Sequence, residues 1–176
     1  MYPIIYIVTH HLQSAPLSLL PSMERYRRDG LIRIVSAMVS VNIPEKPEPL
    51  EDLPPGIIPD NFEQTAHILR HRFDGPRRAV KIALATRKAS LLSWGWPGKL
   101  RASDADHDAL LAAVYFSRPD CDLWRPGIDI EDEIGWQPDA VIMTDPMTIV
   151  EIGGSYTKEK LERRAEAAIE YRRILY

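Results

Sequence analysis

Hydrophobic residues recur every three or four positions in several stretches of this chain, which is the spacing of an amphipathic helix. In 18–31, for example, Leu19, Leu20, Met23 and Tyr26 share one side, and Gly30 is a natural stop. The same spacing predicts further helices. Together the predicted helices cover 18–31, 62–73, 86–94, 103–116 and 157–175.

Other stretches are short, rich in β-branched residues and partly alternating, which is typical of strands. The run 32–41 predicts a strand or a strand pair, and 80–85 predicts one strand. The runs 140–143 and 147–152 are separated by Thr144-Asp145-Pro146, which favours a hairpin turn. Helix, hairpin and helix from 103 onward predict a compact α/β module.

Two stretches carry no regular pattern. The segment 44–59 contains six prolines, so we expect a surface loop or linker there. The acidic segment 120–135 is expected to be irregular. Trp94-Gly-Trp-Pro-Gly98 interrupts the chain, and it places the expected domain boundary near 99–103.

The net charge of −3 is the sum of two unlike parts. Residues 1–101 hold 14 Lys and Arg against 9 Asp and Glu, a net charge of +5. Residues 102–176 hold 8 against 16, a net charge of −8. A basic part followed by an acidic part fits a surface for an anionic polymer beside a cluster that could hold a divalent cation. Two solvated faces that neutralise each other explain the same counts equally well.

The predicted hairpin brings two acids together. Asp139 stands at the start of one strand and Glu151 near the end of the next, so the two carboxylates can converge on one cation. Oxygen ligands of this kind suit Mg²⁺ or Mn²⁺, which can assist phosphodiester hydrolysis. The simpler alternative is that Asp139 caps a turn and Glu151 faces solvent.

Pro138-Asp139, a turn and Glu151 on a second strand resemble the motif of the PD-(D/E)xK nuclease-like superfamily. In that motif a lysine follows the Glu by two positions, where this chain has Gly153. The resemblance implies that Lys158 or Lys160, at the start of the final helix, replaces the missing lysine. A degenerate site is the other implication.

More of the chain resembles the replication-relaxation family of plasmid and mobile-element proteins. The segments that carry the resemblance are 23–34, 81–92, 106–115, 138–141 and 149–156. The resemblance implies a winged-helix-like basic region over 1–101 and a PD-(D/E)xK nuclease-like domain over 102–176, an α/β (α+β) chain. His107-Asp108 matches a His-Asp pair before the nuclease core, which implies Asp108 as a further metal ligand, although first-turn acids also favour a helix by themselves.

Basic residues of the first part are the candidate DNA contacts. They are Arg25, Arg27, Arg28, Arg77, Arg78, Lys81, Arg87 and Lys88. The chain has too few residues before 18 for the two helices that normally precede a recognition helix, so we expect phosphate contacts rather than full base readout.

The composition excludes some classes. No stretch approaches the ~18 apolar residues of a membrane helix, so we expect no membrane partner. With Cys121 as the one cysteine, an internal disulfide is excluded, and we expect a cytoplasmic protein. Three hypotheses remain: a DNA-associated, Mg²⁺-dependent endonuclease; a DNA-binding or regulatory adaptor of the same fold without catalysis; and an acidic protein-interaction module. A protein partner or a homo-oligomer is compatible with each.

Overall fold

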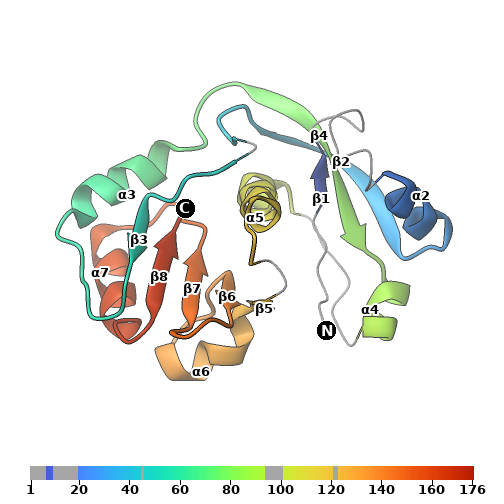
Figure 1. The fold of residues 1–176 in the computed structure, drawn as a ribbon. Coiled ribbons are helices and arrows are strands. Elements are labelled where there is room, and N and C mark those ends of the chain that lie inside the picture. Colours follow the sequence, from blue (N-terminus) through green and yellow to red (C-terminus); the bar gives the residue numbers. More distant parts are fainter. Residues whose placement is uncertain (1–6, 10–19, 45, 94–100, 121–122) are drawn as a thin grey trace. The chain divides into compact units, whose positions relative to one another are not determined.

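The computed structural model of the protein describes residues 7–9, 20–44, 46–93, 101–120 and 123–176 (Figure 1). The chain forms two compact units, both of which combine helices with a sheet. Unit 1 comprises residues 1–44 and 75–113, and unit 2 comprises residues 45–74 and 114–176. The mixed α/β class is thus as expected, whereas the compact units differ in their chain limits from the predicted modules 1–101 and 102–176.

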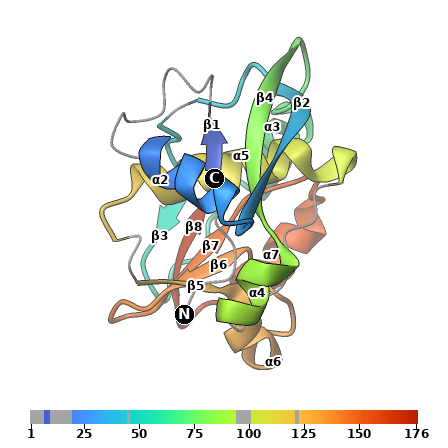
Figure 2. The same cartoon turned by 90° about the vertical axis from the view of Figure 1, so that its right-hand side faces the viewer.

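Unit 1 contains a three-stranded antiparallel sheet in the order β1-β4-β2. The strands β2 (Ile32–Ser40) and β4 (Arg77–Ala85) pair over their full lengths, from Ile32 opposite Ala85 to Ser40 opposite Arg77 (Figure 2). The short strand β1 (Ile7–Thr9) pairs with the other edge of β4. Both strands predicted at 32–41 and 80–85 are confirmed, and they are partners although the segment between them belongs to unit 2.

The helices α2 (Leu20–Arg28) and α4 (Arg87–Ser93) precede β2 and follow β4. Gly30 has a φ of +68°, a left-handed conformation that ends α2 and turns the chain into β2. The helix α5 (Ala105–Ser117) follows a short 3₁₀ turn, η1 (Ala102–Asp104). All three predicted helices in this part of the chain are confirmed within two or three residues at each described end.

A buried carboxylate joins α5 to the sheet of unit 1. Asp106 is 8% exposed, and its Oδ1 accepts a hydrogen bond from the backbone N–H of Ser40 at 2.6 Å. Its Oδ2 lies 2.9 Å from Arg77 Nη1. The acid therefore joins the end of β2 and the start of β4 to the first turn of α5, which gives Asp106 a structural role.

Unit 2 contains a five-stranded mixed sheet in the order β3-β8-β7-β6-β5. Its strands are β3 (Glu51–Leu53), β5 (Trp124–Pro126), β6 (Ala140–Ile142), β7 (Thr148–Glu151) and β8 (Arg172–Leu175). The predicted hairpin is confirmed, because β6 and β7 are antiparallel neighbours, whereas β7 and β8 run parallel.

The prediction of one helix over 157–175 is wrong. The helix α7 spans only Lys158–Ala167. After a short turn, the chain forms β8 beside β7. Ile174 and Leu175 are 1% and 2% exposed, and the N–H of Tyr176 donates to the carbonyl of Glu151 at 2.9 Å. Burial in a sheet and pairing with a distant strand override the local helical spacing.

Two segments expected to lack regular structure contain short elements. The proline-rich segment 44–59 contributes β3 to the edge of the sheet, paired with β8. The acidic segment 120–135 contains β5, the 3₁₀ helix η3 (Gly127–Ile130) and α6 (Glu131–Ile134). The strands β3 and β5 lie at the two edges of the sheet, and each has only three residues, too few to show alternation. The proline-rich and acidic compositions of their segments therefore predicted irregular structure.

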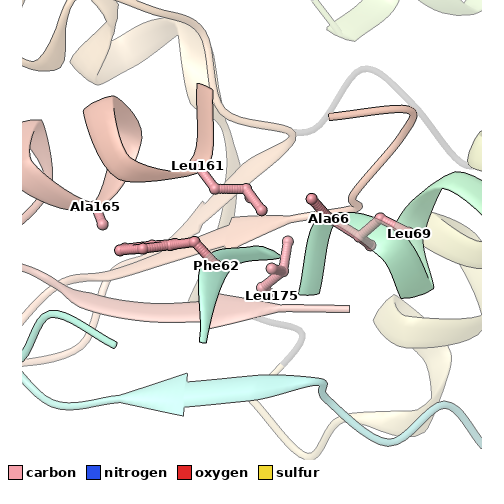
Figure 3. Packing of buried hydrophobic residues seen from close by; sticks show 6 residues of the cluster. All are labelled: Phe62, Ala66, Leu69, Leu161, Ala165 and Leu175. Carbon is pink, nitrogen blue, oxygen red and sulfur yellow. The ribbon is translucent and has the colours of Figure 1, made fainter. Parts of the chain in front are cut away.

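Helix α3 (Phe62–His71), predicted at 62–73, packs with α7 over β8. Figure 3 shows the apolar cluster that joins them: Phe62, Ala66, Leu69, Leu161, Ala165 and Leu175. The buried stripe of each helix has the three-to-four spacing read from the sequence. A second cluster, which includes Ile134, Val141, Ile149 and Ala168, joins α6 to β6 and β7.

The helices of the described residues are all too short or too polar to cross a membrane.

Candidate functional site

The hairpin of unit 2 holds Asp139 beside Glu151. Ala140 is opposite Val150 in the register of β6 and β7, so the residue before β6 lies beside the last residue of β7. Asp139 Oδ2 accepts a hydrogen bond from the N–H of Ile152 at 2.6 Å. The two acids singled out in the sequence therefore meet at one end of the hairpin.

Glu151 is buried, with 3% of its surface exposed, and both of its carboxylate oxygens have partners. Oε1 accepts a hydrogen bond from Trp136 Nε1 at 2.5 Å. Oε2 accepts one from the hydroxyl of Tyr156 at 3.1 Å and is paired with Arg164 Nη1. The alternative in which Glu151 faces solvent is thus excluded.

Burial is the main influence on the acidity of Glu151. Together with the negative charge of Asp139, it raises the pKa of Glu151 to about 7, against the lowering effects of Arg164, Trp136 and Tyr156. The same surroundings raise the pKa of the Tyr156 hydroxyl, through burial and through the charge of Glu151. A raised pKa of a buried carboxyl group beside a second acid is a feature that candidate functional sites often share.

Arg164 is the cation that pairs with Glu151, and no motif in the sequence indicated it. Its side chain is 15% exposed, and its guanidinium carbon lies 5.2 Å from the ring centre of Trp136 and 4.7 Å from that of Tyr156. Arg164 Nη1 also donates to the hydroxyl of Tyr156 at 2.7 Å. The available signal was its position three residues after Leu161 and four before Ala168, both buried, which places Arg164 on the inner side of α7.

The two lysines proposed as replacements for the motif lysine lie in different surroundings. Lys160 Nζ is 3.8 Å from the ring centre of Tyr156, and its pKa is lowered by burial and by Arg164 while Glu151 and Asp139 oppose that change. Lys158 is exposed and lies 3.7 Å from Glu162 one turn later in α7. The structure thus brings Lys160 into the field of both acids, and it pairs Lys158 with another residue.

Packing explains why the motif position holds glycine. A Cβ at Gly153 would overlap Leu69 Cδ2, and it would lie 2.7 Å from Cδ1 and 3.0 Å from Cγ of the same residue. Arg72, directly after α3, also donates to the carbonyl of Gly153 at 2.9 Å. Helix α3 therefore covers the position from which a motif lysine would project.

The third candidate ligand, Asp108, belongs to α5 and to unit 1, where its Oδ1 lies 3.4 Å from His107 Nδ1. Among the described residues there is no group of three or more His, Cys, Asp or Glu side chains placed to hold a metal ion. Arg164, Trp136 and Tyr156 engage both oxygens of Glu151. The residues at this site therefore do not fit Mg²⁺ or Mn²⁺ unless Arg164 leaves Glu151.

The candidate DNA contacts form two groups in unit 1. Arg25, Arg27, Arg28, Arg87 and Lys88 lie on α2 and α4, and all five are exposed. Two of them have an acid nearby in the same helix or directly after it: Arg25 is 3.8 Å from Asp29, and Arg27 is 3.8 Å from Glu24.

The second group lies on β4 and contacts β2 and the residues that follow it. Arg77 Nη2 donates to the carbonyl of Met38 at 2.7 Å, in addition to its pair with Asp106. Arg78 Nη2 donates to the carbonyl of Ile43 at 2.8 Å, and Lys81 Nζ to the hydroxyl of Ser36 at 2.7 Å. These three cations have structural partners on the same sheet or just after it, whereas the five cations of the first group are exposed on two helices.

Comparisons with protein-family models, with curated proteins and with solved structures find no match to this chain. The resemblance to the replication-relaxation family therefore stays a prediction that rests on the residues themselves.

Substitution of Gly153 by alanine should destabilise unit 2 by roughly 1–3 kcal/mol, because the new methyl group overlaps Leu69 in a packed core. Chemical denaturation of the whole protein measures this. Gly154→Ala is the matched control, since its Cβ would meet only Tyr156 Cε1 at 3.7 Å. In a Leu69→Ala background the cost of Gly153→Ala should shrink; equal costs in both backgrounds would show that Leu69 is not the obstacle.

The raised pKa of Glu151 predicts a specific pH dependence of stability. An unfolded glutamate titrates near ~4.3, so between that value and about 7 the folded state binds more protons than the unfolded one. The free energy of unfolding should therefore fall as the pH rises through this window, by up to about 4 kcal/mol from this group. Glu151→Gln should remove that component, and Glu162→Gln should not. Denaturation curves at pH 4.5 to 8 measure it; a constant difference between wild type and Glu151→Gln would contradict it.

Proposed function

We propose that the protein is a DNA-binding adaptor, in which a winged-helix-like basic region is joined to a nuclease-like core that has lost catalysis. The observation that carries the DNA-binding part is the gathering of five exposed cations where α2 meets α4. We call this set the basic surface: Arg25, Arg27, Arg28, Arg87 and Lys88.

Hydrogen bonds hold the two helices of the basic surface together. The N–H of Thr86 donates to the carbonyl of Leu31 at 3.0 Å, and its hydroxyl donates to the carbonyl of Gly30 at 2.7 Å. Lys88 Nζ donates to the carbonyl of Asp29 at 2.8 Å. The end of α2 and the start of α4 are therefore fixed side by side, although 58 residues separate Arg28 from Arg87.

The charge of this surface suits an anionic polymer. The stretches 24–30 and 86–88 together carry five cations against Glu24 and Asp29, a net charge of +3. The two ion pairs are exposed, and such pairs contribute at most ~1 kcal/mol, so phosphate groups can replace the acids at little cost. Contacts of this kind release counterions and give binding that weakens with salt.

The charge of the whole of unit 1 supports the same proposal. By sequence, unit 1 carries 11 Lys and Arg against 5 Asp and Glu, a net charge of +6. Unit 2 carries 11 against 20, a net charge of −9. The division into compact units therefore separates the charges more sharply than the division of the sequence at residue 101.

Element order supports the family part of the proposal. The helix α2 and the turn at Asp29-Gly30 lead into β2, which pairs with β4 as the two strands of a wing would, although the segment 45–74 lies between these strands in sequence. In unit 2, Pro138-Asp139, the hairpin, Glu151 and the following α7 keep the order of the nuclease-like motif. A role in a plasmid or another mobile element is the extension that the resemblance suggests.

The adaptor is favoured over the enzyme because Glu151 is engaged by protein groups. A metal ligand must offer a free oxygen, whereas Arg164 pairs with Oε2 and Trp136 donates to Oε1. At the motif position, Gly153 cannot be extended without displacing Leu69.

A second candidate function is phosphodiester cleavage with Mg²⁺ or Mn²⁺. The observation in its favour is Lys160, which lies against Tyr156 and in the field of both Asp139 and Glu151.

Reversal of two charges on the basic surface should weaken DNA binding. In Arg27→Glu/Arg28→Glu, loss of two phosphate contacts should lower the affinity for a fluorescent 30-base-pair duplex at least tenfold at 50 mM salt. The slope of log K against log salt should fall by about 2. Fluorescence anisotropy measures both quantities.

The matched control is Lys158→Glu/Arg163→Glu, which makes the same change of net charge at two exposed positions of α7 in unit 2. It should bind nearly as well as wild type. Equal weakening in both double variants would point to net charge rather than to the basic surface. No binding by wild type at low salt would overturn the proposal and leave the protein-interaction module.

Cleavage is tested separately with supercoiled plasmid in Mg²⁺ or Mn²⁺. We expect no nicking above the level of a matched preparation of Asp139→Ala, since Glu151 is closed by Arg164. Nicking by wild type that Asp139→Ala, Glu151→Ala and Lys160→Ala each abolish would establish the enzyme instead.

A further inference from the structure

The end of the hairpin contains two acids and two cations of the same chain. Asp139 and Glu151 supply the negative charges, and Arg164 and Lys160 come from one side of α7, four positions apart. Glu151 is 3% exposed, so water screens its charge poorly. Two neighbouring acids, one of them buried, need compensating positive charge.

We propose that the Arg164 guanidinium takes the place of a divalent cation at Glu151, so that the Asp139–Glu151 pair is a cation site closed by the protein's own side chain. Positive charge reaches the acids from α7 instead of from solution. Arg164 pairs directly with Glu151, and Lys160 adds its charge beside Tyr156. Two acids and two cations then balance, as two acids and one divalent ion would.

The aromatic residues hold Arg164 in this position. Trp136 and Tyr156 both lie near its guanidinium, at 5.2 and 4.7 Å, which favours a cation there. Both residues also donate to Glu151 through their own polar groups. The arginine and the acid therefore share the same two supports, which is the arrangement of a built counterion rather than of an incidental surface pair.

The spacing of the two cations supports this assignment. Like charges four positions apart destabilise a helix by roughly 0.2–0.5 kcal/mol, and Arg164 indeed lowers the pKa of Lys160. Both cations nevertheless lie beside the surroundings of Glu151: Arg164 pairs with it, and Lys160 contacts the ring of Tyr156, whose hydroxyl donates to Glu151. Neutralisation of Asp139 and Glu151 would explain why Lys160 and Arg164 occur four positions apart despite their repulsion.

Removal of Arg164 should therefore open a site for a metal ion. The side chain is 15% exposed, so its truncation gives solvent a path to Glu151. The probe is Mn²⁺ alone, titrated at pH 8 and followed by electron paramagnetic resonance of the free ion. Arg164→Ala should bind Mn²⁺ at least tenfold more tightly than wild type, and Glu151→Gln in that background should abolish the gain.

The matched control is Arg163→Ala, an exposed arginine one position earlier on α7, which should bind Mn²⁺ like wild type. Arg164→Gln is the second variant, because it retains an N–H donor near Glu151 and Tyr156 while it loses the charge. Should either variant unfold without metal, circular dichroism should show that Mn²⁺ restores its fold.

Two results would overturn the inference. One is Mn²⁺ binding by wild type that Glu151→Gln removes, since the site would then be open. The other is an Arg164→Ala or Arg164→Gln protein, folded or unfolded, that gains neither Mn²⁺ affinity nor Mn²⁺-dependent folding. The inference does not depend on DNA binding, which is measured with variants of unit 1.

Discussion

The buried carboxylate of Glu151 is the interaction on which unit 2 depends. It ties the end of β7 to Trp136 after α6, to Tyr156 in the loop and to Arg164 in α7. A buried charge that loses its partner costs ~3–5 kcal/mol, so these segments can occupy only positions that satisfy it. The contact therefore selects one placement of α7 over the sheet from the several that its apolar stripe alone would allow.

The placement of α7 determines which residue fits at position 153, where the nuclease-like motif has a lysine. Leu161 and Ala165 of α7 pack with Leu69 of α3 over β8, and Leu69 fills the space beside Gly153. A lysine at residue 153 and this packing of α3 exclude each other. The positive charge near Glu151 must then come from another element, and α7 supplies it.

Local pattern predicted the elements that are stabilised locally. The helix α3 and the hairpin of β6 and β7 were confirmed because periodicity and turn chemistry are properties of adjacent residues. The strand β8 was missed because its pairing with β7 is parallel and non-local, and Arg172 continued a helical stripe. Asp139 and Glu151 were found from a motif, whereas Arg164 carried no motif and its role depends on the tertiary position of α7.

The chain order also conceals how the charges are distributed. The segment 45–74 lies between β2 and β4 in sequence, yet it folds with unit 2 and carries seven acids against three bases. It follows that the strongly acidic insertion dilutes the basic character of the first part when the sequence is read linearly. Because β2 and β4 pair along their full lengths regardless of it, the basic unit is continuous in space although it is interrupted in sequence. The charge that matters for an anionic partner is therefore the +6 of unit 1, not the −3 of the chain.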